Sequence, residues 1–344
     1  MTPLTATPAN LPPDAVLFDL MFGAIVERSI YVAAQLGVAD ELGDDTKTAA
    51  ELAGATGTHT ESLYRLLRLL ASYGCFEEGS DGRFRNTSLS DLLRSDSPTS
   101  MRDFVLMIAN DWNWQTIASL SHSVQTGKLA FEHAFGMTTW EFFEANPEQG
   151  ALFNRAMTSV SSGVVGPITD AYDFSHLGKI VDVAGGHGHL LSSILSANPG
   201  VLGVLFDVPS VIAGAGEHFE KAGVSDRVEM VAGDFFEAVP SGADAYILKY
   251  IIHDWLDPDC IRILGNIRDA MNPDGKVLIC EMVVPEGNGP SPAKVLDIQM
   301  LLAAGGKERT EAEFRQLLDN SGFELERIIP TSSPLQIVEG VRKK

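Results

Sequence analysis

The residues best placed to do chemistry are one histidine and two glutamates in the second half of the chain. His253 stands just past a strand-like run, in the segment KYIIHDW, Glu281 ends another such run, and Glu308 lies in the segment GGKERT. A carboxylate bonded to the far nitrogen of an imidazole fixes its tautomer and raises its basicity. These residues are candidates for a general base with its orienting acids, although an isolated histidine or a surface carboxylate is more often structural.

A glycine-rich turn supplies a second set of candidates. The sequence DVAGGHG begins at Asp182 and precedes a helix-like stretch. Its glycines, which let a ligand approach the backbone closely, are Gly185, Gly186 and Gly188. Counted from Gly186, the third glycine of a dinucleotide fingerprint falls on Leu191, so that pattern fails. The pattern acidic-x-G-x-G-x-G fits from Asp182, except that Ala184 replaces the first glycine. Taken alone, the turn is also compatible with a simple tight connection.

Acidic residues also end the next two strand-like runs. Asp207 can accept both hydroxyls of a ribose. In the segment GDFF, Asp234 can meet an adenine amino group while the ring of Phe235 packs on the base. Three motifs at the carboxyl ends of successive strands describe one crevice, which is where open α/β sheets bind ligands. These acidic residues indicate a cofactor that contains adenosine, and the failed dinucleotide fingerprint indicates that no pyrophosphate is bound. S-adenosylmethionine fits both conditions.

The elements that position these motifs alternate between strand and helix from Ile180 onward. The strand-like runs are KIVDVAGG, VLGVLFDVP, VEMVAGDFF, AYILKYII and GKVLICEMVVP. This alternation predicts an α/β fold whose parallel sheet is covered on both faces. The last run, LERIIPTSSPLQIVEGVRK, predicts an antiparallel hairpin at the sheet edge.

The first part of the chain, Asp14 to about Asp96, has a helical pattern. Two amphipathic helices are followed by the hairpin pattern CFEE, SDGR, FRNT, which together predict a winged-helix module. Such modules often bind DNA, but the second helix carries only Arg65 and Arg68, and the whole chain has a net charge of −21. That charge repels nucleic acid and anionic membranes, so we favour dimerisation over DNA binding.

Residues 101–165 form a further helical stretch that is rich in aromatic residues. They allow two interpretations, core packing or an apolar lining for a flat substrate. The cluster comprises Trp112, Trp114, Phe131, Phe135, Trp140, Phe142 and Phe143.

Composition narrows the class of protein. No apolar run reaches the roughly 18 residues of a spanning helix, so we expect no membrane insertion. The N-terminus, MTPLTATPANLPPD, reads as a short disordered leader without a secretory signal. The three cysteines lack CxxC spacing, which favours free thiols in a reducing, cytoplasmic compartment.

The motifs GDFF, LKYIIHDW, ICE and GGKERT, in this order, resemble the plant caffeate-type O-methyltransferase family. The similarity includes the segment LFNRAM and the winged helix, and thus nearly the whole chain. Bacterial members of this family act in aromatic polyketide and antibiotic biosynthesis. The resemblance implies a homodimer formed by a winged-helix dimerisation domain, expected at residues 14–100. It also implies a Rossmann-like methyltransferase domain at residues 101–344, with a helical linker at 101–165 and the core at 166–344.

The resemblance also implies roles for individual residues. His253 matches the general base, flanked by Glu281 and Glu308. The cofactor contacts are Asp207 for the ribose, Asp234 and Phe235 for adenine, and Lys249, beside the loop of Asp182, Gly185, Gly186 and Gly188. Met157 and Met300 match methionines that contact the substrate ring. We also expect substrate contacts from Asp254, beside the base, and from Trp112 of the aromatic cluster. Ala184 departs from the family pattern, and we expect its methyl group to crowd the cofactor's amino-acid end.

The sequence therefore predicts transfer of a methyl group from S-adenosylmethionine to an aromatic hydroxyl, without a metal. A phenol has a pKa near 10, and a base at His253 would accept its proton as attack develops. Two rivals stay open: a relative that binds the cofactor without methylating, and a winged-helix regulator that senses a metabolite. The acceptor itself, including nitrogen or carboxylate acceptors, is not identified by the sequence.

Overall fold

The structure is a computed structural model that describes residues 12–343. The leader expected to be disordered lies outside the described residues as far as residue 11. The chain divides into two compact units. We call Met1–Ala118 with Met137–Val160 the N-terminal unit, and Ser119–Gly136 with Ser161–Lys344 the C-terminal unit.

The N-terminal unit contains the expected winged helix. Thr48 caps α3 by accepting the backbone N–H of Glu51, whose carboxylate accepts the Thr48 N–H in return. Helix α4 buries Leu63, Leu67 and Leu70 along one face. The predicted hairpin is β2 and β3, which pair antiparallel, with β1 on the far side of β3. The predicted helix, turn, helix and hairpin are therefore confirmed.

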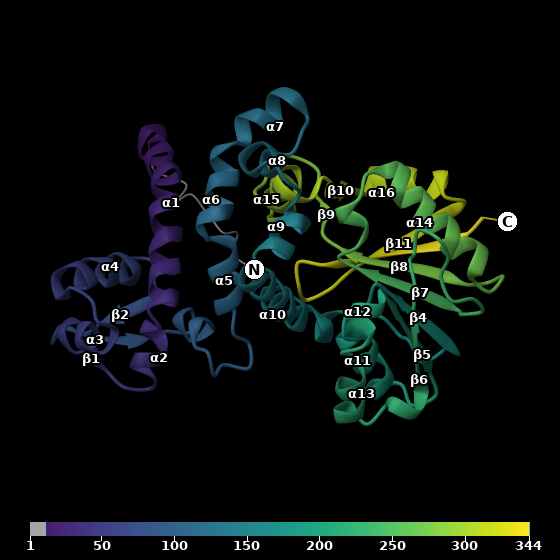
Figure 1. The fold of residues 1–344 in the computed structure, drawn as a ribbon, viewed down its shortest axis with the longest axis horizontal. Helices are drawn as coiled ribbons and strands as arrows, with labels where there is room; N and C mark the ends of the chain where they lie inside the picture. Colours follow the sequence, from purple (N-terminus) through teal and green to yellow (C-terminus); the bar gives the residue numbers. More distant parts are fainter. Residues whose placement is uncertain (1–11, 344) are drawn as a thin grey trace. The chain divides into compact units, whose positions relative to one another are not determined.

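Figure 1 labels the helices of the N-terminal unit and its strands β1 and β2. Its helices are α1 (Pro13–Gln35), α2 (Val38–Leu42), α3 (Ala49–Thr56), α4 (Thr60–Ser72), the 3₁₀ turn Ser90–Leu93, α5 (Arg102–Ile108), α6 (Asp111–Ala118) and α9 (Thr139–Ala145). Its strands are β1 (Lys47–Thr48), β2 (Phe76–Glu78) and β3 (Arg83–Asn86). Helix α10 (Pro147–Ala171) begins in this unit and ends in the other.

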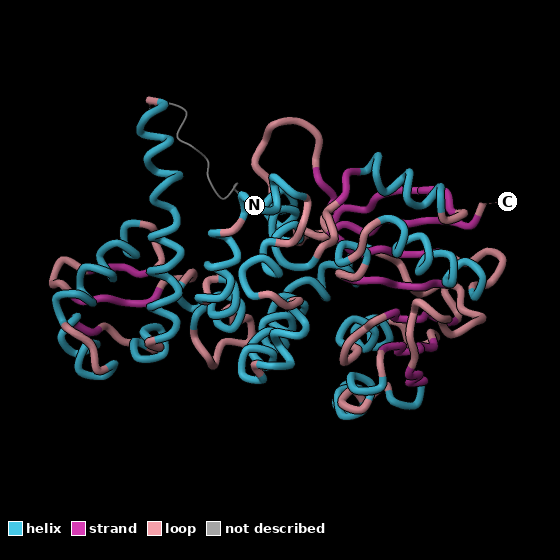
Figure 2. Tube along the Cα trace, turned by 45° about the horizontal axis from the view of Figure 1, so that its top comes forward, coloured by secondary structure: helices cyan, strands magenta, loops and turns pink. Residues whose placement is uncertain are grey.

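The C-terminal unit is built on a seven-stranded sheet with the order β11-β12-β8-β7-β4-β5-β6. Five strands run parallel, while β12 pairs antiparallel with both β8 and the edge strand β11. The expected strands and the hairpin at the sheet edge are confirmed, and Figure 2 traces them in magenta. The strands are β4 (Lys179–Val183), β5 (Leu202–Asp207), β6 (Val228–Ala232), β7 (Ala245–Lys249), β8 (Lys276–Glu281), β11 (Phe323–Pro330) and β12 (Gln336–Arg342).

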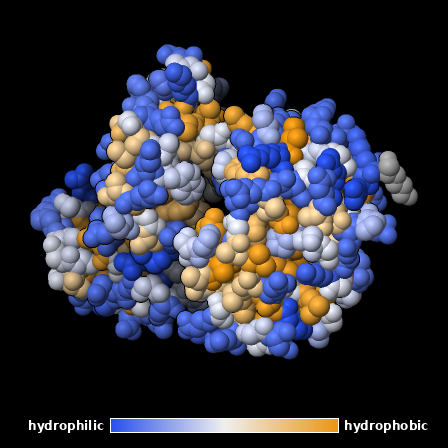
Figure 3. All heavy atoms as spheres, turned by 45° about the vertical axis from the view of Figure 1, so that its right-hand side comes forward, coloured by the Kyte–Doolittle hydropathy of each residue, from blue (hydrophilic) through white to orange (hydrophobic). Residues whose placement is uncertain are grey.

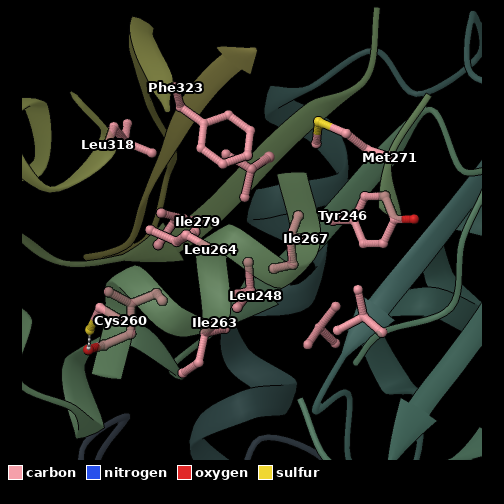
Figure 4. Packing of buried hydrophobic residues seen from close by; sticks show 14 of the residues in the cluster. Tyr246, Leu248, Cys260, Ile263, Leu264, Ile267, Met271, Ile279, Leu318 and Phe323 are labelled. Carbon is pink, nitrogen blue, oxygen red and sulfur yellow. Dashed lines mark hydrogen bonds between the residues drawn. The ribbon is translucent and has the colours of Figure 1, made fainter. Parts of the chain in front are cut away.

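Helices cover both faces of this sheet. One buried cluster joins the sheet to α14 (Asp257–Ala270) and α16 (Glu311–Asn320), and Figure 4 shows part of it. A second cluster on the other face includes residues of α11 (His189–Ala197), α13 (Gly216–Ala222) and the end of α10. Strands buried on both faces must be apolar throughout, which explains their unbroken hydrophobic runs. The remaining elements are α7 (Leu120–Thr126), α8 (Ala130–Phe135), α12 (Pro209–Ile212), α15 (Pro292–Gln299), the 3₁₀ turns Ser225–Arg227 and Ile252–Asp254, the π-helical turn Met300–Ala304, β9 (Val283–Val284) and β10 (Arg309–Thr310).

The order of the strands decides where ligands can bind. From β4 the chain moves to β5 and β6 on one side, and then crosses to β7 and β8 on the other. Open α/β sheets bind ligands at the carboxyl ends of the strands where the order reverses. Asp182, Asp207, Asp234, His253 and Glu281 lie at or just after the carboxyl ends of β4 to β8, so this topology gathers them at one edge. The side of the molecule seen in Figure 3 is covered largely by polar side chains, with apolar patches between them.

Candidate active site

His253 lies in the turn Ile252–Asp254, directly after β7. Its side chain is buried, with 7% of the residue exposed. Its Nδ1 lies 2.7 Å from Oε1 of Glu308, and its backbone N–H donates to Oε1 of Glu281 at 2.9 Å. The structure therefore brings together the three residues that the sequence proposed for catalysis, with one acid on the ring and the other on the main chain.

The Glu308 contact fixes the tautomer of the imidazole. A carboxylate only accepts hydrogen bonds, so Nδ1 of His253 carries the proton and a neutral ring keeps its lone pair on Nε2. The nearest ionic neighbour of Nε2 is Oδ1 of Asp254 at 3.5 Å, too long for a strong hydrogen bond. The nitrogen opposite Glu308 is thus available to take a proton.

The electrostatic surroundings of His253 favour its charged form. Burial alone lowers the pKa of the imidazole, but the hydrogen bond to Glu308 and the charges of Glu281 and Asp254 outweigh it and raise the pKa to about 9. Burial in turn raises the pKa of Glu281 to about 7, with His253 acting against that rise. In the protein without cofactor, the imidazole is therefore protonated on both nitrogens at neutral pH, and Nε2 can act as a base once it has lost its proton.

The segment Gly305–Thr310 is held close to this turn. Strand β10 pairs in parallel with β9, which follows Glu281 by two residues. A Cβ added to Gly306 would lie 1.8 Å from the carbonyl oxygen of His253, so only glycine fits there. The backbone N–H of Glu308 donates to Oδ1 of Asp297 at 3.0 Å. Sequence reasoning missed Asp297, because its place in α15 gives no sign of this partner.

The glycine loop after β4 packs tightly around Asp182. This carboxyl is 2% exposed, and burial raises its pKa to about 7. Its Oδ2 has no hydrogen-bond partner among residues 12–343. A Cβ on Gly185 would lie 2.5 Å from Asp182 Cγ, and one on Gly188 would lie 2.1 Å from the ring of Phe219. Packing therefore requires glycine at 185 and 188, while the positive φ of Gly186 and Gly188, 61° and 80°, favours glycine there.

Ala184 and Tyr250 are the two non-glycine residues with positive φ in the described part of the chain, at 54° and 57°. They follow the adjacent strands β4 and β7. The first glycine position of the loop therefore does need the left-handed conformation, and Ala184 adopts it under strain. Its N–H donates to the carbonyl of Phe206 at 2.7 Å, which holds the turn. Tyr250 was missed, because strain of this kind cannot be read from a sequence.

Asp207 ends β5 beside the glycine loop. Its Oδ2 accepts the backbone N–H of Gly186 at 2.8 Å, and its Oδ1 accepts that of Val208 at 2.7 Å. Burial raises its pKa, with these two hydrogen bonds acting in the opposite direction. Each oxygen keeps a lone pair, which suits a pair of neighbouring hydroxyls.

The other expected cofactor contacts follow β6 and β7. Asp234 is exposed and accepts the N–H of Phe236, while the Phe235 ring meets the Trp255 ring edge-on at 6.0 Å. Lys249 Nζ donates to Ser161 Oγ at 2.6 Å. Burial lowers the pKa of Lys249, and the charge of Asp182 opposes this. Ser161 was also missed by sequence reasoning.

These residues fit an adenosine-bearing cation. Asp182 offers a buried carboxylate oxygen without a partner among the described residues, and the backbone at Gly186 is open, since an added Cβ would meet no atom within 4 Å. A buried carboxylate of this kind favours a positively charged neighbour. The same region holds no set of three or more His, Cys, Asp or Glu side chains able to bind a metal, as far as the structure describes the chain.

The four expected substrate contacts remain predictions. Asp254 lies beside His253, and Met300 begins the π-helical turn, which is half-buried in the C-terminal unit. Met157 and Trp112 belong to the N-terminal unit. Trp112 is 8% exposed, donates to Gln149 at 3.2 Å and contacts the rings of Phe142 and Phe143. Packing within this unit therefore involves part of the aromatic cluster.

Comparison with known proteins agrees with this geometry. Residues 117–324 match the O-methyltransferase domain, and residues 18–96 match the O-methyltransferase dimerisation domain. The phenazine O-methyltransferase PhzM of Lysobacter antibioticus is 44% identical, over 96% of this chain and 96% of its own. The mitomycin biosynthesis 6-O-methyltransferase of Streptomyces lavendulae is 40% identical, over 97% and 96%.

The fold is also shared with solved methyltransferases. A methyltransferase in calicheamicin biosynthesis, solved in its S-adenosylhomocysteine-bound form, superposes with a TM-score of 0.90 at 37% identity, covering 97% of this chain and 100% of that one. The two domain matches, the relatives and the solved structure lead to one conclusion. The chain belongs to the family of S-adenosylmethionine-dependent O-methyltransferases.

Proposed function

We propose that the enzyme methylates a hydroxyl group of an aromatic small molecule, with His253 as the general base. The observation that carries this is the 2.7 Å contact between His253 Nδ1 and Glu308, which directs Nε2 away from the acid. The relatives named for phenazine and mitomycin chemistry support an aromatic acceptor.

The protein's part in the reaction is proton removal and alignment. S-adenosylmethionine, when bound, supplies a methyl group made electrophilic by its sulfonium. His253 in its neutral form accepts the hydroxyl proton at Nε2 as the oxygen attacks, an effect typically worth about 10²–10⁴-fold. Glu308 and Glu281 stabilise the resulting imidazolium from the ring and from the main chain. Met157, Met300, Asp254 and Trp112 are the proposed acceptor contacts.

The cofactor is proposed to lie along the ends of β4 to β7. Asp207 would bind the ribose hydroxyls, and Asp234 with Phe235 the adenine. Asp182, Lys249 and the loop glycines Gly185, Gly186 and Gly188 would enclose the amino-acid end. Ala184 lines the same loop without preventing the left-handed turn that the cofactor loop needs.

His253→Gln tests the base, because glutamine has a similar size but cannot accept the proton. We expect turnover to fall by at least about 10²-fold while S-adenosylhomocysteine, titrated calorimetrically, binds with nearly unchanged affinity. His176→Gln, at an exposed histidine of the same unit, is the matched control. Turnover near the wild-type value in His253→Gln would remove His253 from the reaction.

Assembly as a homodimer is proposed through the N-terminal unit. Helix α1 exposes a row of large apolar side chains, and the residues concerned lie in or next to the matched dimerisation domain. They are Leu17, Phe18, Leu20, Met21, Phe22 and Ile25, each between 45% and 68% exposed. Exposed apolar surface of this extent marks an interaction site. Sedimentation analysis should find a dimer for the wild type and a monomer for the double variant Phe18→Asp, Met21→Asp.

The remaining expectations concern location, domain limits, the product and DNA binding. None of the described helices is long and apolar enough to cross a membrane, and we propose a cytoplasmic location and domain limits at residues 14–100 and 101–344. Product mass separates methylation, which adds one CH₂, from the chemistry of a non-methylating relative. An electrophoretic binding test at moderate salt should show no shift of DNA, as the net charge of −21 predicts.

A further inference from the structure

Arg309 is a fully buried guanidinium whose hydrogen bonds converge on the turn that carries His253. None of its surface is exposed. Nη1 donates to the carbonyl of Ile252 at 3.0 Å, and Nη2 donates to the carbonyl of Trp255 at 2.9 Å. Ile252 directly precedes His253, and Trp255 follows it by two positions. One side chain therefore closes both ends of the turn.

The same guanidinium ties the turn to the start of α14. Its Nε and Nη2 both donate to Oδ1 of Asp257, at 3.1 and 2.7 Å. Nη1 also reaches the carbonyl of Lys307 in its own segment at 3.4 Å. A buried charge is tolerated when it is paired and its donors are used, and both conditions hold here.

The two turn carbonyls have weaker donors besides Arg309: the backbone N–H of Trp255 donates to the carbonyl of Ile252 at 3.3 Å, and the thiol of Cys260 lies near both carbonyls. Its Sγ lies 3.4 Å from the carbonyls of Ile252 and of Trp255, and the labelled Cys260 in Figure 4 shows a dashed contact of this kind. A thiol is a weak donor, whereas hydrogen bonds from a guanidinium are charge-assisted. Arg309 makes the shorter, charge-assisted hydrogen bonds to both carbonyls, so it supplies the main side-chain restraint on this stretch of backbone.

Glu308 and Arg309 are consecutive residues, and together they hold His253 in two ways. Glu308 binds the imidazole, and Arg309 binds the backbone on either side of it. We propose that Arg309 is a positioning residue that acts on the reaction through His253, an inference that rests on the proposed role of His253 as base. Arg309 itself touches no reacting atom.

Arginine suits this role better than lysine would. A planar guanidinium directs five N–H donors at fixed angles, whereas a lysine ammonium is a single point of charge on a flexible stem. Arg309→Lys therefore keeps the charge but cannot reach both carbonyls and Asp257 together. Small displacements of a catalytic group are costly, since a shift of about 1 Å can lower the rate about 10²-fold.

A double-mutant cycle between Arg309 and His253 tests the inference. The proteins are the wild type, Arg309→Lys, His253→Gln and the double variant, with residual turnover followed by product mass. In the wild-type background we expect Arg309→Lys to lower kcat by about 10–100-fold, with KM for S-adenosylmethionine and affinity for S-adenosylhomocysteine nearly unchanged. In the His253→Gln background the same change should have little further effect, because the group on which it acts is gone.

Two variants serve as matched controls. Arg315→Lys changes an exposed arginine of α16 that pairs only with Glu311 in the described contacts, and Cys260→Ala removes a thiol whose contacts with the two carbonyls and with Nη2 of Arg309 are all long, at 3.4 Å. We expect both to keep most of the wild-type kcat. If Arg309→Lys folds poorly, Asp257→Asn is the second variant. It weakens the ion pair of the Arg309 guanidinium but leaves the guanidinium in place, and it should fold because the Asp257 side chain is 47% exposed.

The outcomes separate this inference from the proposed function. If Arg309→Lys lowers kcat by the same factor in both backgrounds, or weakens S-adenosylhomocysteine binding as much as kcat, Arg309 does not act through His253. If His253→Gln alone retains wild-type turnover, the proposed base is wrong, and the positioning role is lost with it. The inference is supported if Arg309→Lys or Asp257→Asn lowers kcat strongly in the wild-type background and has little effect in the His253→Gln background.

Discussion

The imidazole Nδ1 of His253 lies 2.7 Å from Oε1 of Glu308, although the two residues are 55 positions apart in the chain. Glu281 meets the backbone N–H of the same histidine rather than its ring. The two acids therefore have different tasks: Glu308 sets the tautomer and the orientation of the imidazole, and Glu281 fixes the main chain of the turn.

Glu308→Gln should separate these tasks. An amide of the same shape lacks the negative charge that stabilises an imidazolium, so we expect kcat to fall roughly 10²–10⁴-fold, as expected when the orienting acid of a histidine is neutralised. S-adenosylhomocysteine affinity, measured by calorimetry, should stay nearly constant. The control is Glu311→Gln, at an exposed position of α16. A kcat unchanged in Glu308→Gln would show that the ring does not depend on this contact.

The pH dependence of the reaction should report the charge of His253. Because the pKa is raised to about 9 in the protein without cofactor, the base is protonated and inactive at lower pH. We expect kcat/KM for S-adenosylmethionine, which reports the free enzyme, to rise with pH and level off near that value. The positive charge of a bound sulfonium disfavours the imidazolium, so the profile for the acceptor at saturating cofactor should level off at a lower pH.

Two acceptors whose phenols differ in acidity provide the control for this profile. An inflection that follows the acceptor belongs to the phenol, and one that stays in place belongs to the enzyme. A profile for S-adenosylmethionine that is flat across neutral and mildly alkaline pH would contradict the raised pKa of His253.

Asp207→Asn should weaken the cofactor site. Hydrogen bonds to a charged group contribute about 1.5–3 kcal/mol each, so we expect S-adenosylhomocysteine affinity to fall by at least about tenfold. The fold should survive, because an amide oxygen can still accept the N–H of Gly186. Asp226→Asn, at an exposed aspartate of the same unit, is the calorimetric control. Equal affinity in both variants would place the ribose elsewhere.

Ala184→Gly should stabilise the protein. Alanine at φ 54° is strained by about 1–2 kcal/mol relative to its preferred conformations, and glycine relieves this while losing up to about 1 kcal/mol to chain entropy. We expect a gain of up to about 1 kcal/mol in the free energy of unfolding, measured by urea titration. Ala151→Gly, within helix α10, should instead cost about 1 kcal/mol. A loss of stability in Ala184→Gly would show that the methyl group contributes packing that outweighs the strain.

Much of this architecture could be predicted because its signals are local. The apolar runs marked β4 to β8, the helix and hairpin patterns marked the winged helix, and acidic residues marked the strand ends. Ala184 was recognised as a departure from the glycine pattern, but its left-handed backbone was not, since that conformation is imposed by the hydrogen bond to Phe206 and by the packing of the loop. Ser161 and Asp297 escaped notice because each matters only through a partner elsewhere in the chain, Lys249 and Glu308 respectively. Tyr250 escaped notice because its positive φ cannot be read from a sequence.

The sequence by itself determined the order of helices and strands and which residues stand at the strand ends, because periodicity and turn signals act over a few neighbouring residues. Only the tertiary structure decided which glutamate meets the imidazole, that Arg309 encloses the same turn, and that Asp182 is left with an oxygen that no described residue satisfies. Such contacts depend on strand order and on the need of buried polar groups for hydrogen bonds. Neither can be predicted from a short segment of the sequence.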